Sequence, residues 1–166
     1  IEQLKATSET ELQILLYTKL IERVGPEQAQ EDLYHSGLPF TGQTHLLNHT
    51  VGDYLYLNYG SSGLLRCKDY FLSSCYHGFV IHAVAVGGMS EVVETLKECR
   101  KQSNQVLSQC THAVGHGYLA HFGYRNLVQA LKYCDQTKEQ MPFLILYSCY
   151  DGVFMENALT APGQAA

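Results

Sequence analysis

The sequence has few basic residues and no tryptophan. It contains 11 lysines and arginines against 16 aspartates and glutamates, which gives a formal net charge of −5. The basic residues are scattered and form no stripe, which argues against nucleic-acid binding as the main task. No apolar run approaches the roughly 18 residues that a membrane-spanning helix needs. The sequence therefore predicts neither a nucleic-acid partner nor a membrane span.

Several cofactor and catalytic motifs are also absent. There is no G-x-G-x-x-G and no G-x-x-x-x-G-K-[ST], so nothing favours nucleotide binding, and there is no G-x-S-x-G nucleophile motif. No C-x-x-C occurs, which disfavours a zinc–thiolate site and covalent haem, while haem held by two histidines stays open. The chain begins at Ile1 without a secretory leader pattern, which we interpret as the start of a processed product.

Helical periodicity runs along almost the whole chain. Apolar residues recur at helical spacing, proline and glycine cluster between the segments, and no alternating strand pattern persists. A first helix is predicted over 9–24, with capping-box spacing of Ser8 and Glu11 at its start. Gly25 is expected to end this helix and Pro26 to open the next. The predicted fold class is all-α.

The rest of the chain repeats a two-helix unit. Apolar helices, here called A helices, carry His45, His77, His112 and Asp151 near their starts, at steps of 32, 35 and 39 residues. A second series of shorter, more polar B helices repeats the first two steps at its cysteines. Two interleaved series with one period indicate an α-solenoid, with chance similarity in a helical bundle as the alternative. The A helices are predicted at 43–59, 73–87, 105–122 and 142–159, and the B helices at 26–36, 62–70, 90–101 and 125–136.

This period resembles that of tetratricopeptide and Sel1-like repeats over roughly residues 26–159, without the Trp, Leu-Gly and Tyr pattern of the tetratricopeptide repeat. The resemblance implies the architecture, and Sel1-like repeats further imply interhelical disulfides on export and binding of other proteins. We expect a single helical-repeat domain over 1–160. Its predicted parts are an N-terminal helix within 1–25, repeats at about 26–60, 61–88, 89–123 and 124–159, and a tail at 161–166.

The six cysteines follow the repeat. Each later unit has one cysteine at the end of its B helix and one at the start of the next A helix, and a short loop brings those two ends within disulfide distance. In the first unit both cysteines are missing together, since His35 and Gln43 take their places. Three local disulfides predict a secreted or periplasmic protein, with six reduced cysteines and a redox role as the alternatives. The predicted disulfides are Cys67–Cys75, Cys99–Cys110 and Cys134–Cys149.

Seven of the eight histidines fall on the predicted A helices. His45 with His49, and His112 with His116, have the i, i+4 spacing that places two imidazoles on one helix face. Such a pair is a common way for a helix to offer two nitrogen ligands to one metal. The repeat pattern aligns His45 with His112, so the two pairs are interpreted as equivalent.

The other two A helices carry a related pattern. His77 and Asp151 each precede a glycine and hold the repeat position of the first histidine in each pair. His82 and Glu156 follow five residues later, a step that turns a side chain away on an ideal helix.

The sequence therefore predicts a histidine–carboxylate site for one or two transition-metal ions, either iron, zinc, copper or manganese. In an enzyme the metal would activate water or oxygen, with Glu156 or Asp53 as the base. Two alternatives stay open: histidines that are structural and inherited by duplication, and acid–base catalysis without a metal. The predicted ligands are His45, His49, His77, His82, His112, His116 and Asp151.

At the level of function, these patterns favour an exported metal-binding helical-repeat domain. Its first partner is the metal ion, and a small molecule or a protein on the face of the A helices is a candidate second partner. The competing interpretation is a metal-free Sel1-like interaction module with structural histidines.

Overall fold

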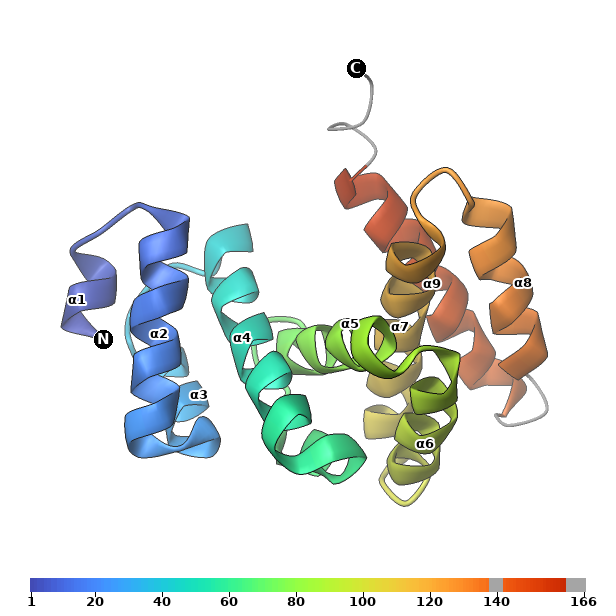
Figure 1. The fold of residues 1–166 in the computed structure, drawn as a ribbon, viewed down its shortest axis with the longest axis horizontal. Helices are drawn as coiled ribbons and strands as arrows, with labels where there is room; N and C mark the ends of the chain where they lie inside the picture. Colours follow the sequence, from blue (N-terminus) through green and yellow to red (C-terminus); the bar gives the residue numbers. More distant parts are fainter. Residues whose placement is uncertain (138–141, 161–166) are drawn as a thin grey trace. The chain divides into compact units, whose positions relative to one another are not determined.

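Glycine and proline determine where the helices end. In the computed structural model, which describes residues 1–137 and 142–160, every secondary-structure element is helical (Figure 1). Gly25, Gly60 and Gly123 end helices with positive φ values of 87°, 58° and 85°, a conformation that costs glycine little. The α-helices are α1 (Glu2–Lys5), α2 (Thr10–Val24), α3 (Pro26–Tyr34), α4 (Gly42–Tyr59), α5 (Ser74–Gly87), α6 (Met89–Cys99), α7 (Asn104–Phe122), α8 (Leu127–Thr137) and α9 (Phe143–Thr160), and a 3₁₀ helix, η1, covers Gly60–Arg66.

The predicted all-helical class and the A helices are confirmed in position, but three local expectations are wrong. The segment predicted as a B helix at 62–70 is instead the 3₁₀ helix η1. It covers Gly60–Arg66 and contains two glycines, Gly60 and Gly63. The short helix α1 was not expected at all. Ser8 and Glu11 form no capping box, because the N-cap of α2 is Glu9 and its side chain makes no capping bond. The predicted tail at 161–166 lies outside the described residues.

The chain forms two compact units, Ile1–Phe79 and Val80–Ala166, with the boundary inside α5. In the first unit α2 packs on α1, α3 and α4, and η1 packs on α4 (Figure 1). Tyr17 is fully buried at the centre of these contacts and donates a hydrogen bond to the Ala29 carbonyl at 3.0 Å. The apolar core of this unit includes Leu4, Ile21, Leu33, Leu47, Val51, Leu55 and Leu64.

The second unit is built around α7. This helix packs against α6, α8 and most extensively α9, and its residues 113–119 are all buried (Figure 1). Gly117 lies against the second half of α5, where an added Cβ would be 3.2 Å from methyl groups of Val80 and Val84. None of the helices in the described ranges is long and apolar enough to span a membrane.

In the first unit α4 and the start of α5 cross at two glycines. A Cβ on Gly52 would lie 2.2 Å from the Cys75 carbonyl oxygen, and a Cβ on Gly78 would lie 2.2 Å from the His49 carbonyl oxygen. No side chain larger than hydrogen fits at these distances, so the two backbones are in direct contact. The crossing places the helix face that carries His49 next to α5.

In the second unit α7 and α9 cross in the same way. A Cβ on Gly115 would lie 2.1 Å from the Cys149 carbonyl oxygen, and a Cβ on Gly152 would lie 2.0 Å from the His112 carbonyl oxygen. In each pair one glycine meets the cysteine that starts the partner helix, and the other meets a histidine. The two crossings are therefore equivalent.

This equivalence corrects the predicted register. His112 occupies the place of His49 and not that of His45. The His49 carbonyl faces Gly78 of its partner helix, and the His112 carbonyl faces Gly152 in the same way. The sequence pattern aligned the first histidine of each pair and so was wrong by one helical turn. His116 consequently corresponds to Asp53, four residues after His49.

The three predicted disulfides are confirmed. Cys67–Cys75, Cys99–Cys110 and Cys134–Cys149 have Cα separations of 5.6, 6.3 and 5.8 Å, and no cysteine is free among the described residues. Each joins the start of an A helix to the segment before it, and all six sulfur-bearing side chains are buried. On the chain-entropy model each closed loop stabilises the fold by about 2–3 kcal/mol.

Replacing Gly152 with alanine should destabilise the protein by about 2 kcal/mol or more, because the new methyl group overlaps the His112 carbonyl. Gly42→Ala is the matched control, since a Cβ there meets nothing within 4 Å at the start of α4. Urea unfolding followed by circular dichroism measures both. Equal midpoints for the two variants would contradict the close crossing.

Candidate metal centre

Three histidines gather at the crossing of α4 and α5 in the first unit. His45 and His49 lie one turn apart on α4, and His77 lies in the first turn of α5. One ligand nitrogen from each lies within 4.8 Å of the others, close enough for one ion to draw all three together. His77 is 1% exposed, and the other two are half-buried.

A backbone carbonyl sets the tautomer of His45. Its Nδ1 is 2.7 Å from the Phe71 carbonyl oxygen, which can only accept, so Nδ1 carries the hydrogen. The neutral ring then has its lone pair on Nε2, which is 3.3 Å from His77 Nδ1. Two nitrogens bound to one tetrahedral zinc are about 3.3 Å apart. A ligating histidine that donates its other N–H to a carbonyl is a usual metal-site arrangement.

The carbonyl that holds His45 belongs to an unusual turn. Phe71, Leu72 and Ser73 have φ values of 51°, 56° and 59°, in the left-handed region that costs non-glycine residues about 1–2 kcal/mol each. The Cys67–Cys75 disulfide closes the loop that contains this turn. The loop therefore keeps the Phe71 carbonyl pointed at His45, and strained backbone of this kind is concentrated at functional sites.

A second cluster lies at the crossing of α7 and α9. His112 and His116 occupy one face of α7, and their Nε2 atoms are 3.1 Å apart. His116 Nδ1 lies 2.7 Å from Glu156 Oε2, and Tyr124 donates to the other Glu156 oxygen at 3.0 Å. The His116 side chain is 4% exposed and that of Glu156 is 13% exposed, so this hydrogen-bonded pair is shielded from water.

A carboxylate and a backbone group lie beside His112. Its Nδ1 is 3.4 Å from Asp151 Oδ2, and its ring hydrogen-bonds the backbone of Ser148. Burial and the neighbouring His116 lower the pKa of His112, against the opposing effect of Asp151. Burial raises the pKa of Glu156. The hydrogen bond and charge interaction with His116, together with the hydrogen bond from Tyr124, outweigh burial, so the pKa of Glu156 is lowered. Glu156 is therefore an ionised acceptor, and His116 Nδ1 carries the hydrogen.

These contacts bring two ring nitrogens face to face. The Nε2 atoms of His112 and His116 are 3.1 Å apart, and the Nδ1 hydrogen of His116 is directed at Glu156. A neutral His116 therefore presents an unprotonated Nε2 toward His112. That nitrogen can accept a hydrogen bond from His112 or bind a metal ion, and a metal ion would draw both ring nitrogens to itself.

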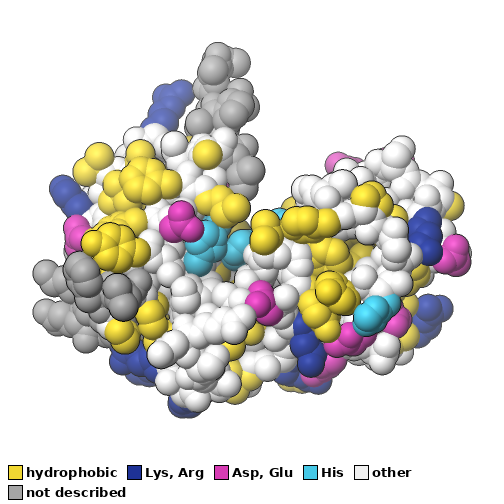
Figure 2. All heavy atoms as spheres, turned by 180° about the vertical axis from the view of Figure 1, so that it is seen from behind, with side chains coloured by type: hydrophobic (Ala, Val, Ile, Leu, Met, Phe, Trp, Pro, Cys, Tyr) yellow, Lys and Arg dark blue, Asp and Glu magenta, His cyan; other side chains and the backbone are white. Residues whose placement is uncertain are grey.

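The structure thus assembles five of the predicted ligands into two histidine clusters: His45, His49 and His77 in the first unit, and His112 and His116 in the second. Asp151 contacts the Nδ1 side of His112, and Glu156 the Nδ1 side of His116, so both carboxylates lie behind the imidazoles. His82 is on α5 in the second unit and Asp53 on α4 in the first, and neither belongs to a group of converging metal-type ligands among the described residues. Figure 2 shows imidazole atoms at the surface beside an acidic side chain.

Sequence reasoning missed the groups that hold the imidazoles from behind. The Phe71 carbonyl is a backbone atom, and no residue type predicts where it points. Tyr124 lies beyond the end of α7, after Gly123, and only the fold brings it to Glu156. Of the groups that hold the imidazoles, only Glu156 and Asp151 had a signal in the sequence, namely their spacing on the last A helix.

No protein family, curated protein or solved structure matches this chain. The geometry and chemistry of its own residues are therefore the basis for any function. What the structure supports is an all-helical protein with disulfides and with histidine clusters that could bind a metal ion.

Replacing Glu156 with glutamine should weaken metal binding by about 10–100-fold, because His116 loses the charged acceptor that fixes its tautomer. Glu94→Gln is the control, since it removes only an exposed ion pair with Lys97. Competition with a chromophoric zinc chelator measures the affinity of each. Equal affinities in the two variants would contradict an orienting role for Glu156.

Removing the Cys67–Cys75 disulfide with paired serines should weaken metal binding at the first cluster, because the turn that holds His45 is released. The test uses His112→Ala with His116→Ala as background, so that the remaining binding reports the first cluster. In the same background, serines at Cys99 and Cys110 remove a disulfide of the second unit. A similar loss for both cysteine pairs would point to general destabilisation and contradict a positioning role for the turn.

Proposed function

We propose that this chain is an exported helical-repeat domain whose task is to bind transition-metal ions at its histidine clusters. The ligands are His45, His49 and His77 at one cluster and His112 and His116 at the other. Asp151 and Glu156 orient the second pair in this proposal, in place of the ligand role that the sequence suggested for Asp151. His82 remains a predicted ligand.

The convergence of Nε2 atoms is the single observation that carries the proposal. The Nε2 atoms of His112 and His116 lie 3.1 Å apart, and His116 directs its Nδ1 hydrogen outward to Glu156, so its Nε2 faces inward. His45 repeats the arrangement with a backbone carbonyl as the outward acceptor.

Internal duplication supports both the site and the repeat. The crossings of α4 with α5 and of α7 with α9 share glycine contacts, a cysteine and a histidine at matching places. Successive A helices also pack directly on one another within each unit, as the layer of an α-solenoid would require. Duplication of one helix pair accounts for the two equivalent crossings and for His49 and His112 at matching places.

The state of the cysteines supports export. All six are paired within local loops, a pattern that persists in oxidising compartments such as the periplasm or the extracellular space. Periplasmic or secreted metal-binding proteins need ligands that survive these conditions. Imidazole does so, whereas free thiolates are oxidised.

Imidazole-rich sites suit zinc, copper, iron or manganese. For divalent ions, affinity generally rises from manganese to iron to copper, and zinc binds less tightly than copper. Two or three protein ligands leave coordination positions open, and a metal held in this way can activate water or oxygen. In that case Asp53 or Glu156 would be the base.

The test is metal content and Co²⁺ binding of the untagged protein purified without chelator. We expect one or two equivalents of metal by elemental analysis and d–d absorption on addition of Co²⁺. His112→Ala with His116→Ala should remove one class of site, and alanines at His45, His49 and His77 the other. His35→Ala and His121→Ala are controls, since both residues are exposed and lie outside the clusters.

Retention of all metal by both cluster variants would overturn these ligand assignments. No binding of any of the four metals by the wild-type protein would overturn the proposal. The chain would then be better explained as a metal-free interaction module of Sel1-like type, and pull-down with the disulfide-bonded protein would be the next experiment.

A further inference from the structure

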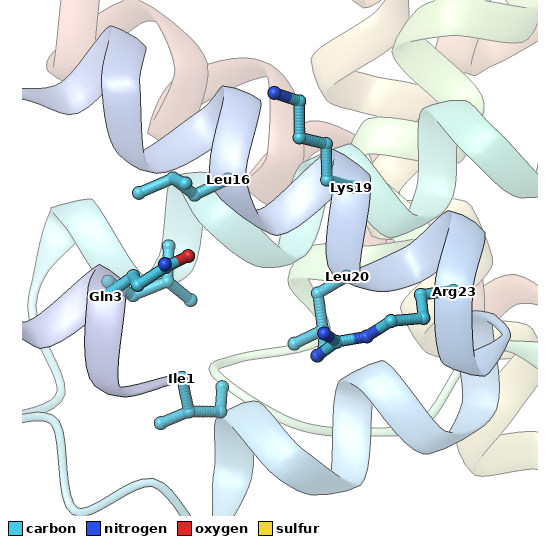
Figure 3. A pocket seen from close by; sticks show the side chains of 7 residues that line it. Ile1, Gln3, Leu16, Lys19, Leu20 and Arg23 are labelled. Carbon is cyan, nitrogen blue, oxygen red and sulfur yellow. The ribbon is translucent and has the colours of Figure 1, made fainter.

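A small pocket lies between α1 and α2 in the first unit. All of its lining residues precede the histidines of that unit in the sequence. It has a volume of about 230 Å³ (Figure 3). Its lining residues are Ile1, Gln3, Leu4, Leu16, Lys19, Leu20 and Arg23. Among these only Leu4 and Leu20 are buried, so the pocket opens to the surface.

The lining combines an apolar floor with two positive charges. Leu16 and Leu20 follow one another at helical spacing on α2, and Lys19 and Arg23 repeat that spacing beside them. Figure 3 shows the Arg23 side chain extended toward Leu20, with Gln3 reaching in from α1. The pocket thus offers an apolar surface, guanidinium and ammonium donors, and a neutral amide.

These two cations differ from the lysines and arginines that form ion pairs. Lys5, Arg66, Lys97 and Lys101 all form ion pairs with glutamates. Lys19 and Arg23 form none with the described residues, and no carboxylate lines the pocket. In a protein of net charge −5, two unpaired cations at the rim of an apolar pocket give a local site for an anion.

We propose that this pocket binds a small anionic amphiphile, namely a short- to medium-chain carboxylate. The carboxylate lies against the Arg23 guanidinium and the Lys19 ammonium, and the Gln3 amide supplies a further N–H donor. The alkyl chain lies on Leu4, Leu16 and Leu20. The volume is below the roughly 300 Å³ at which pockets for drug-sized ligands begin, which limits the ligand to a short chain. This inference does not rest on the metal proposal.

The test is a titration of the full chain with hexanoate, followed by amide chemical shifts in ¹H–¹⁵N spectra. The expected result is saturable binding in the millimolar range, with shifts confined to α1 and the face of α2 from Leu16 to Arg23. Acetate, which lacks the chain, and 1-hexanol, which lacks the charge, should each bind more weakly than hexanoate.

Arg23→Gln and Lys19→Gln should each weaken hexanoate binding by about three- to five-fold, as expected for exposed charge pairs, and leave 1-hexanol binding unchanged. Lys132→Gln on α8 is the control for loss of an exposed positive charge. The charges would be shown irrelevant, and the proposal overturned, if 1-hexanol bound as tightly as hexanoate or if Arg23→Gln matched Lys132→Gln. Shifts spread over other helices would also overturn it.

Discussion

Direct backbone contact between crossing helices is the constraint on which the rest of this structure depends. Gly52 with Gly78, and Gly115 with Gly152, let the two helices of each pair approach until a carbonyl of one lies against the Cα of the other. Without that approach, side chains would separate the helices and the histidines would not converge. Glycine inside a helix costs about 1 kcal/mol relative to alanine, so the two crossings are maintained against the intrinsic preference of the chain.

The sequence predicted the features that have local causes. Cysteines at helix ends separated by short loops could pair in few ways, so the disulfides were predictable, and helix ends followed glycine and proline. What failed were features set by tertiary contact. The alignment of His45 with His112 matched residue types, whereas the crossing equates His49 with His112 because their carbonyls face glycine. The segment expected as an α-helix at 62–70 is instead a 3₁₀ helix that ends at Arg66, and its Gly63 packs against the Leu55 carbonyl.

The candidate site was predictable as a set of residues but not as a geometry. Spacing on α4 and α7 was enough to find the imidazole pairs, since i, i+4 residues share a face. The tautomers depend on groups that spacing does not reveal: the Phe71 carbonyl, held in a left-handed turn, and Glu156, held by Tyr124. These contacts turn a histidine-rich helix surface into a pair of sites where ring nitrogens converge.

Side-chain ¹⁵N spectra of the histidines test this account most directly, because they report which ring nitrogen carries the hydrogen. In metal-free protein at neutral pH, the account predicts Nδ1–H tautomers for His45 and His116, and a large shift of their Nε2 signals on addition of Zn²⁺. Nε2–H tautomers, or Nε2 signals unchanged by Zn²⁺, would contradict it and assign these histidines to the packing of the helices alone.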